Sequence, residues 1–281
     1  MELKGEYGSA KVFAKELDDG AKDQIVRLLD QSFIEGSTVR IMPDVHQGMG
    51  CVIGFTADMG EKVIPNIVGV DLGCGMLTVE LGKADIDFPT LDKIIKDKVP
   101  SGRSVHESRK YDFDKLEELH VFRELKDTRR IERSLGTLGS GNHFIEVATD
   151  SKDNKYLVIH SGSRNLGLQV ADYYQRLAVD LCSGKEEYFV KKDEIIKTYK
   201  EQGKRNHIKS ALKLLEKEYK DLEPKYPKDL CYLTGEYRER YLHDMRICQE
   251  YASINRKVMA DIIVSNLFSK DLEEFPHFET V

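Results

Sequence analysis

A glycine-rich segment over residues 68–76 places a carboxylate and a thiol three positions apart, and this pairing constrains the chain more than any other feature. Asp71 and Cys74 lie among three glycines in this segment. Glycine allows a sharp turn and a close approach to a ligand, so both side chains can point into one cavity. A thiolate beside a carboxylate is unfavourable unless a cation compensates the charge. The spacing therefore predicts a metal site on a turn after an apolar strand. A buried free thiol beside an aspartate that caps a turn is the alternative.

Two histidines lie in similar glycine-containing segments and are candidate partners of this turn. His143 follows Gly139–Asn142, whose backbone N–H groups can form an anion-binding nest. His160 ends an apolar run and precedes Ser161–Arg164, which offers hydroxyls, backbone donors and a guanidinium to a phosphate. A histidine hydrogen-bonded in a core turn is the alternative for His143. One Asp, one Cys and two His suit Mn, Fe, Co or Zn better than Ca or Mg.

A fourth segment, Met42–Gly48, presents an aspartate and a histidine two positions apart at the end of an expected strand. Side chains at i and i+2 share one face of a strand. Asp44 is therefore a candidate base and His46 a candidate ligand, with a salt-bridged turn as the alternative.

Composition restricts the class of protein. The chain has 281 residues, of which 33% are charged, and no apolar run approaches the roughly 18 residues needed to cross a bilayer. Its five cysteines are scattered without short-spaced pairs, so a disulfide framework is not expected. We therefore expect a cytoplasmic protein without membrane association. The net charge of −6 argues against a surface coated in cations for nucleic acid, although it allows a local basic groove.

The pattern of apolar residues predicts a single α+β domain over residues 1–281, with a mainly helical region at 185–268. Short apolar runs between glycines and prolines predict strands at residues 39–42, 51–55, 67–70, 77–81, 136–147 and 156–160. Helical spacing predicts helices over residues 21–29, 168–181 (capped by Asn165), 208–222 and 236–268, and helical patches around residues 116–125. Residues 185–228 carry 13 Lys or Arg against 9 Asp or Glu. They form either a solvated helical face or a contact with a polyanion.

Four segments, taken together and in this order, resemble the RtcB family of RNA ligases: Met42–Gly48, Val70–Gly75, Gly139–Glu146 and His160–Arg164. The likeness spans most of the chain and is diffuse over residues 85–133 and 185–228. It implies one large domain with mixed and antiparallel sheets around a central metal-binding cleft, flanked by helices. It also implies a GTP- and manganese-dependent ligase that joins an RNA 3′-phosphate or 2′,3′-cyclic phosphate to a 5′-hydroxyl, as in tRNA splicing and RNA repair.

The resemblance assigns roles to individual residues by their position in the motifs. Asp71, Cys74 and His143 would hold one Mn²⁺, and Cys74 and His160 would hold a second. The guanine nucleotide would contact Asn142, His143, Phe144, Ile145 and Glu146. Arg164 would bind an RNA phosphate, and Asp44 would act on the 5′-hydroxyl. RNA and GTP are the implied partners, together with an archease-like activator.

The chain departs from the family pattern at its end. Family members continue past the position of residues 279–281 into a His-Asn pair that completes the second metal site, and later into the histidine that takes up GMP. We therefore expect an amino-terminal portion of the enzyme, truncated before its C-terminal segments and impaired in ligation. His277 does not match the His-Asn motif. Two other functions stay open, a metal-dependent phosphoesterase and a non-catalytic RNA-binding or regulatory paralogue.

Overall fold

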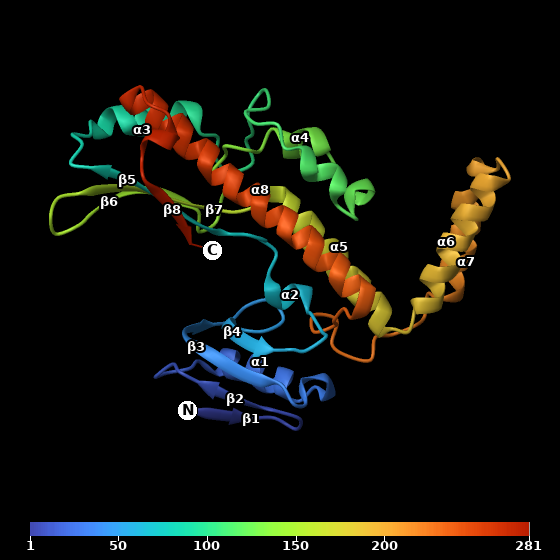
Figure 1. The fold of residues 1–281 in the computed structure, drawn as a ribbon. Helices are drawn as coiled ribbons and strands as arrows, with labels where there is room; N and C mark the ends of the chain where they lie inside the picture. The colour runs from blue at the N-terminus through green and yellow to red at the C-terminus, as the bar shows by residue number, and fades with distance from the viewer. Residues whose placement is uncertain (281) are drawn as a thin grey trace. The chain divides into compact units, whose positions relative to one another are not determined.

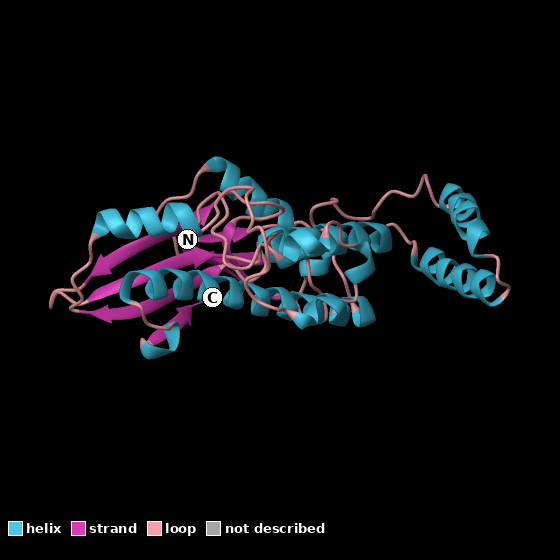
Figure 2. Cartoon of the chain, turned by 90° about the horizontal axis from the view of Figure 1, so that it is seen from above, coloured by secondary structure: helices cyan, strands magenta, loops and turns pink. Residues whose placement is uncertain are grey.

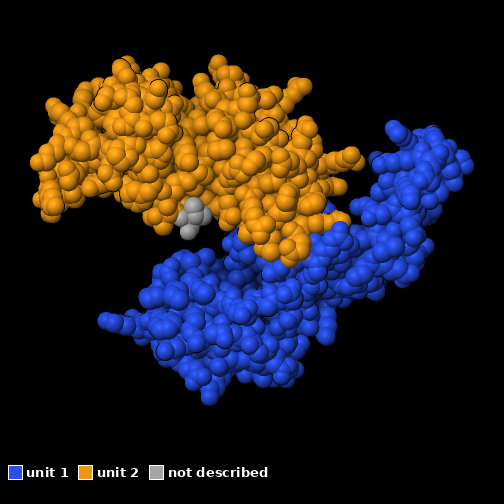
Figure 3. All heavy atoms as spheres, in the orientation of Figure 1, with its two compact units in different colours: residues 1–69, 173–238 blue, residues 70–172, 239–281 orange. Residues whose placement is uncertain are grey.

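The computed structural model describes residues 1–280 as two compact units, each built around one four-stranded sheet (Figure 1). Unit 1 comprises Met1–Gly69 and Tyr173–Arg238, and unit 2 comprises Val70–Asp172 and Glu239–Val281 (Figure 3). Helices α5 (Arg164–Cys182) and α8 (Gly235–Phe268) contribute residues to both units. Mixed helices and mainly antiparallel sheets confirm the expected α+β class.

Unit 1 packs a helix against a sheet of order β1-β2-β3-β4, in which only the β2–β3 pair is parallel. Its strands are β1 (Glu2–Lys4), β2 (Ser9–Val12), β3 (Thr38–His46) and β4 (Ile53–Asp58). Helix α1 (Asp19–Leu29) begins at Asp18, whose side chain accepts the N–H of Ala21 at 2.9 Å. The predicted apolar face of α1 is buried: Ile25 and Leu28 join the core cluster with residues of β2 and β3. A short 3₁₀ helix, η1 (Ser32–Ile34), follows α1.

Unit 1 also contains an antiparallel pair of helices, α6 (Glu186–Glu201) and α7 (Ile208–Glu218), joined through the 3₁₀ helix η4 (Arg205–His207). The two helices lie side by side in both views (Figures 1 and 2). The rings of Tyr188 and Tyr219 pack edge to face at 5.6 Å, and Leu215 is buried. Aromatic and apolar contacts therefore fix the end of the pair that carries the start of α6 and the end of α7.

Unit 2 holds an antiparallel sheet of order β6-β7-β5-β8, which is drawn in magenta with its helices in cyan in Figure 2. Its elements are β5 (Gly75–Gly82), α3 (Phe88–Lys98), η2 (Asp114–Glu118), η3 (Phe122–Glu124), α4 (Thr128–Glu132), β6 (Phe144–Thr149), β7 (Lys155–Ser161), η5 (Leu272–Glu274) and β8 (His277–Thr280). Leu77 of β5 and Ile159 of β7 pack with Met259 and Ile263 of α8 in one core cluster. This packing fixes β5 and β7, and therefore the two chain segments that carry Cys74 and His160. Among the helices that residues 1–280 form, we find none with the length and apolar character that a bilayer crossing requires.

Three local expectations were wrong. Residues 67–70 do not form a strand, because Pro65 starts a short helix, α2 (Pro65–Val68), that ends at Gly69 with φ +106°. The turn that carries Asp71 therefore follows a helix. The expected strand over residues 136–147 begins only at Phe144, and residues 136–143 form turns and loop. The helical patches expected around residues 116–125 are present as the two 3₁₀ helices η2 and η3. Asn165 lies inside the first turn of α5 and does not cap it, since the helix begins at Arg164.

Candidate functional site

Unit 2 brings the four predicted metal-ligating side chains together. Cys74 Sγ lies 3.0 Å from His160 Nε2 and 3.8 Å from His143 Nε2. His143 Nε2 also lies 2.8 Å from Asp71 Oδ2. Ligand atoms of Asp71, Cys74 and His143 all lie within 4.8 Å of one another. The thiol of Cys74 is thus the common neighbour of both imidazoles, as a ligand shared between two ions would be.

The orientation of His143 directs its Nε2 atom at Asp71 and Cys74. Its Nδ1 lies 2.9 Å from the carbonyl oxygen of Leu138, which can only accept, so Nδ1 donates a proton there. In the neutral ring, the lone pair of Nε2 then faces the carboxylate of Asp71 and the sulfur of Cys74. Three electron-pair donors converge, and either an extra proton or a metal ion must lie between them. A histidine that donates its other N–H to a backbone carbonyl is the usual arrangement of a metal ligand.

His160 is held in a similar way. Its Nε2 faces Cys74, and its ring also forms a hydrogen bond with the backbone of Asn142. The ring of Phe144, paired with His160 across β6 and β7, packs against the imidazole at 5.2 Å. Burial and the nearby charge of His143 lower the pKa of His160, which favours the neutral form that binds metals.

The surroundings of the cluster shift the pKa values of Cys74 and Asp71 in opposite directions. Burial raises the pKa of the Cys74 thiol to about 11, and the charge of Asp71 adds to this effect. Burial would also raise the pKa of Asp71, but its hydrogen bond to His143 and the charge of that ring outweigh burial, so the pKa lies below its ordinary value. Without a cation the cluster therefore contains a protonated thiol beside a carboxylate. A metal ion would be needed to ionise Cys74 at neutral pH.

Glycine is required where the loop after β7 passes Asp71. A Cβ atom at Gly162 would overlap the carboxylate of Asp71, and the next residue, Ser163, donates its N–H to Asp71 Oδ1 at 3.1 Å. Gly73 has φ +81°, and a Cβ there would lie 2.6 Å from the Cα of Gln249 in α8. The glycines of both motifs therefore serve close packing around the aspartate and its turn.

Two buried residues of α8 hold these loops in place, and our reading of the sequence missed them. Arg256 Nη1 donates to the carbonyls of Gly73 at 2.9 Å and Ser161 at 2.8 Å, and its Nε donates to Glu279 at 3.1 Å. One guanidinium thus joins the turn that carries Cys74 to the strand that carries His160. No local sequence pattern indicated this role, because Arg256 lies inside a long helix whose partners are distant in sequence.

Asn255 fixes the neighbouring loop before β6. Its Oδ1 accepts the N–H groups of Gly136 and Thr137 at 2.9 and 3.0 Å, and its Nδ2 donates to the Ser161 hydroxyl at 3.1 Å and to the Gly162 carbonyl at 3.2 Å. The amide is fully buried. A single side chain therefore connects the loop that leads to His143 with the loop that follows His160.

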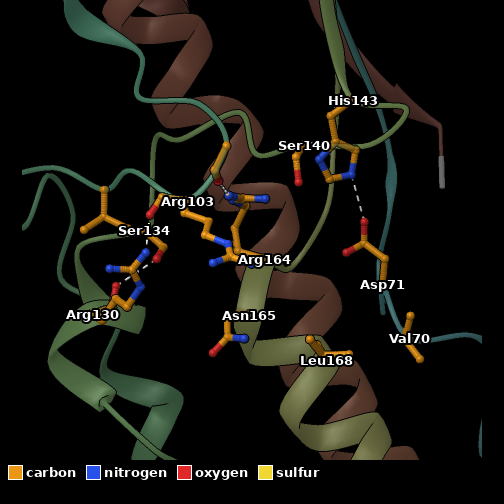
Figure 4. Close-up of a pocket in the computed structure, with 12 residues that line it drawn as sticks. Val70, Asp71, Arg103, Arg130, Ser134, Ser140, His143, Arg164, Asn165 and Leu168 are labelled. Carbon is orange, nitrogen blue, oxygen red and sulfur yellow. Dashed lines mark hydrogen bonds and ion pairs between the residues drawn. The ribbon is translucent and has the colours of Figure 1, made fainter.

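A basic pocket of about 470 Å³ adjoins the cluster within unit 2 (Figure 4). Asp71 and His143, joined by their hydrogen bond, lie on one side, and arginines from three separate segments lie on the other. The arginines are Arg103, Arg130 and Arg164. Ser134, Ser140 and Asn165 add polar groups. Three guanidinium groups against one carboxylate favour an anionic ligand such as a phosphate.

Arg164 is the one pocket arginine that the sequence analysis proposed. Its Nε donates to the Thr137 hydroxyl and its Nη2 to the Gly102 carbonyl, both at 3.1 Å. Arg130 donates to the carbonyl of Arg103, which ties α4 to the segment after α3. Arg103 and Arg130 lie in the stretch where the resemblance is diffuse, so motif reasoning could not select them.

The predicted nucleotide-contact residues are distributed unevenly around the cluster. Of the five, only His143 lines the basic pocket. Ile145 packs against the hydrophobic core of unit 2, and Glu146 is exposed on β6. Asp44 and His46 lie at the end of β3 in unit 1, where His46 Nδ1 is 2.8 Å from the carbonyl of Asp44.

Three further histidines, His120, His243 and His277, lie apart from the Cys74 cluster. His120 and His243 lie near Asp244, whose carboxylate accepts the N–H groups of His120 and Val121 at 2.9 and 3.2 Å and so closes the loop before η3. His277 pairs with Val79 in the sheet, and its Nδ1 lies 2.9 Å from the carbonyl of Phe275. None of these three histidines joins the Cys74 cluster among the residues that the structure describes.

Comparison with known families gives a match over most of the chain. The family described as tRNA-splicing ligase RtcB matches residues 24–127 and 113–277. The RNA-splicing ligase RtcB of Escherichia coli K12 is 28% identical over 273 residues, which cover 89% of this chain and 58% of the relative. The tRNA-splicing ligase RtcB of Archaeoglobus fulgidus is 31% identical over 208 residues, 55% of this chain and 43% of the relative. The chain therefore spans less than two thirds of the length of these curated relatives.

Proposed function

The chain belongs to the RtcB family of tRNA-splicing ligases, and from this premise we propose that the protein is an RNA ligase that acts on broken or spliced RNA. In this proposal it joins a 3′-phosphate or 2′,3′-cyclic phosphate end to a 5′-hydroxyl end with Mn²⁺ and GTP. Because the chain spans 58% of the length of the E. coli relative, ligation is a proposal for the whole protein. For the described residues, the proposal is that they recognise the phosphate end.

The single observation that supports this proposal best is the convergence of Asp71, Cys74 and His143 on one point beside a basic pocket. The donor set fits a divalent transition metal such as manganese, since it combines a carboxylate, a thiolate and imidazoles. Bound divalent ions would neutralise the negative charge that develops on phosphoryl oxygens during transfer. The adjoining arginines explain why the ligand would be a phosphate rather than a neutral group.

Each described residue has a defined task in the proposal. Asp71, Cys74 and His143 would hold one ion, and Cys74 with His160 would supply ligands to a second. Arg164 would bind the terminal phosphate, because its guanidinium lines the pocket while its hydrogen bonds to Thr137 and Gly102 fix its direction. The hydrogen bond between His143 and Asp71 would hold these two ligands in place beside the phosphate.

The remaining roles rest on the family resemblance. Asp44 would act on the 5′-hydroxyl, and Asn142 to Glu146 would contact the guanine nucleotide. An archease-like protein would assist the reaction. Ile145 is partly buried against the core of unit 2.

The test measures end recognition by fluorescence anisotropy. A labelled RNA decamer ending in a 3′-phosphate is compared with the same RNA ending in a 3′-hydroxyl, with and without Mn²⁺. We expect tighter binding of the 3′-phosphate RNA, only when Mn²⁺ is present, and loss of this preference in Cys74→Ala and Arg164→Gln.

Arg109→Gln is the matched control for Arg164→Gln. It removes the same charge from unit 2 at a half-exposed arginine outside the pocket and should retain the preference. Equal affinity for both ends in the unaltered protein would contradict the proposal, and so would equal losses in the two arginine variants.

A further inference from the structure

The α6–α7 pair is strongly polarised in charge along its length. We call residues 197–213 the tip and residues 186–196 with 214–221 the base. The tip carries six cations and one acid, Glu201, whereas the base carries four cations and seven acids. The six tip cations are all exposed: Lys197, Lys200, Lys204, Arg205, Lys209 and Lys213. A chain with a net charge of −6 thus concentrates positive charge at one end of one helical pair.

The tip cations have no acidic partners among residues 1–280, because none of the six side chains takes part in an ion pair there. At the base, by contrast, Lys191 pairs with Glu187 at 3.0 Å and donates to the hydroxyl of Tyr219 at 3.1 Å. The base therefore carries an excess of acidic residues, whereas the tip carries an excess of cations.

Helix stability does not explain the tip. Lys197 and Lys200 near the end of α6 are favoured by the helix dipole, but Lys204, Arg205 and Lys209 lie before or within the first turn of α7, where cations are disfavoured. Lys209 and Lys213 are also like charges at i and i+4, which repel. Folding alone would favour acidic residues at the start of α7. The cations there are therefore better explained by a binding partner.

The tip is an ordered turn that holds these side chains close together. Gly203, at φ +70°, follows the end of α6, and its N–H donates to the carbonyl of Lys200 at 3.1 Å. The N–H of Lys204 donates to the carbonyl of Tyr199 at 2.9 Å. This pair of bonds is a Schellman motif. It reverses the chain directly into η4 and α7. The six charges consequently lie on one compact turn and the adjoining ends of two helices.

We propose that the tip binds the phosphate backbone of the RNA substrate, an inference that rests on the proposed function. Clustered lysine and arginine side chains displace the counterions of a nucleic acid and so bind it in a salt-dependent manner. Contacts to phosphates carry no sequence information, so this surface grips RNA of any sequence. Such a grip would raise affinity for long RNA over short ends.

The test removes three charges at the tip and three at the base. The tip variant is Lys204→Gln/Arg205→Gln/Lys209→Gln, and the control is Lys192→Gln/Lys217→Gln/Lys220→Gln. Both variants change the net charge equally, and neither alters a residue of the cluster or pocket. Binding of a labelled 30-nucleotide RNA with a 3′-hydroxyl end is measured between 50 and 200 mM KCl, so that recognition of a terminal phosphate does not contribute.

For the tip variant we expect about tenfold weaker binding at 0.1 M salt, and a salt-dependence slope reduced by about 2. The control variant should stay within about twofold of the unaltered protein. Equal slopes in all three proteins, or equal losses in both variants, would overturn the proposal. So would an unchanged RNA affinity in a tip variant that has lost binding to vesicles of anionic lipid.

The short 3′-phosphate decamer separates this proposal from the proposed function. If the tip variant keeps the preference for a 3′-phosphate while its affinity for long RNA falls, both proposals hold. If the unaltered protein shows no such preference but the tip variant still loses long RNA, end recognition fails and the tip remains an RNA-binding surface. Far-UV circular dichroism and thermal unfolding confirm that each variant is folded.

Discussion

Replacement of Arg256 by methionine tests whether one buried guanidinium holds the metal-site turn in place. The side chain of Arg256 is fully buried, and that of its partner Glu279 is 20% exposed. Methionine keeps most of the volume but removes three hydrogen bonds, to Glu279 and to the carbonyls of Gly73 and Ser161. The substitution therefore isolates the polar contribution from packing.

The expected loss follows from what the substitution leaves unpaired. Breaking a buried ion pair costs about 3–5 kcal/mol, and the partial exposure of Glu279 places this case near the lower limit. Two carbonyls left without partners cost about 1–3 kcal/mol each. These effects overlap because they share one side chain, so we expect a total of about 4–5 kcal/mol. Affinity for Mn²⁺ should fall about 10- to 100-fold, as for other groups that orient metal ligands.

Urea unfolding followed by far-UV circular dichroism measures the first effect, and calorimetric titration with Mn²⁺ the second. Arg109→Met is the matched control, because Arg109 is 54% exposed and its ion pairs with Asp112 and Glu132 are long, at 3.4 Å. It should cost less than about 1 kcal/mol. If Arg256→Met lost no more stability than Arg109→Met, the role assigned to Arg256 would be refuted.

Three further predictions concern two glycines, two cysteines and Asp71. Gly73→Ala should destabilise the protein by at least about 2 kcal/mol in urea unfolding, because its Cβ atom would meet the backbone of α8. Gly69→Ala should cost about 1 kcal/mol, because a Cβ atom there has open space and only the backbone, at φ +106°, is strained. Similar costs for the two variants would contradict the close packing at Gly73. In metal-free protein, iodoacetamide should modify Cys182 at lower pH than Cys74, because a hydrogen bond from the thiol of Cys231 lowers the pKa of Cys182, whereas burial raises the pKa of Cys74 to about 11. Peptide mapping that finds Cys74 modified first would refute the assignment. The pKa of Asp71 is lower in the folded state than its unfolded value of about 3.9, so its contribution to stability is complete at neutral pH and is lost as the pH falls through the folded value. Asp71→Asn should therefore reduce the acid sensitivity of urea midpoints between pH 6 and pH 3, and an unchanged sensitivity would count against this reasoning.

The elements with strong periodicity were predictable from the sequence. Helices α1 and α8 and strands β5 and β7 have the expected positions, since the spacing of their apolar residues matches the core that they form. Residues 67–70 were misjudged because a short apolar run does not distinguish a strand from a helical turn, and the effect of Pro65 prevailed. Local patterns therefore predicted elements well and boundaries poorly.

The residues of the site also differ in how far the sequence could predict them. Asp71, Cys74, His143 and His160 could be found because each lies in a glycine-containing motif of distinctive chemistry, and the structure brings all four together. Arg256 and Asn255 could not be found, because the site loops that they hold lie about 90 to 180 residues away in sequence and only the packing of α8 brings them together. Groups that supply ligands can be read from motifs, whereas groups that position them depend on the tertiary fold.

Crystallographic location of Mn²⁺ by anomalous scattering tests the central claim most directly. We expect two manganese peaks in unit 2, roughly 3.5–4 Å apart, at the position where Asp71, Cys74, His143 and His160 would supply ligands. Cys74→Ala should abolish both peaks. Manganese bound elsewhere, or full occupancy of this position in the Cys74→Ala protein, would contradict it.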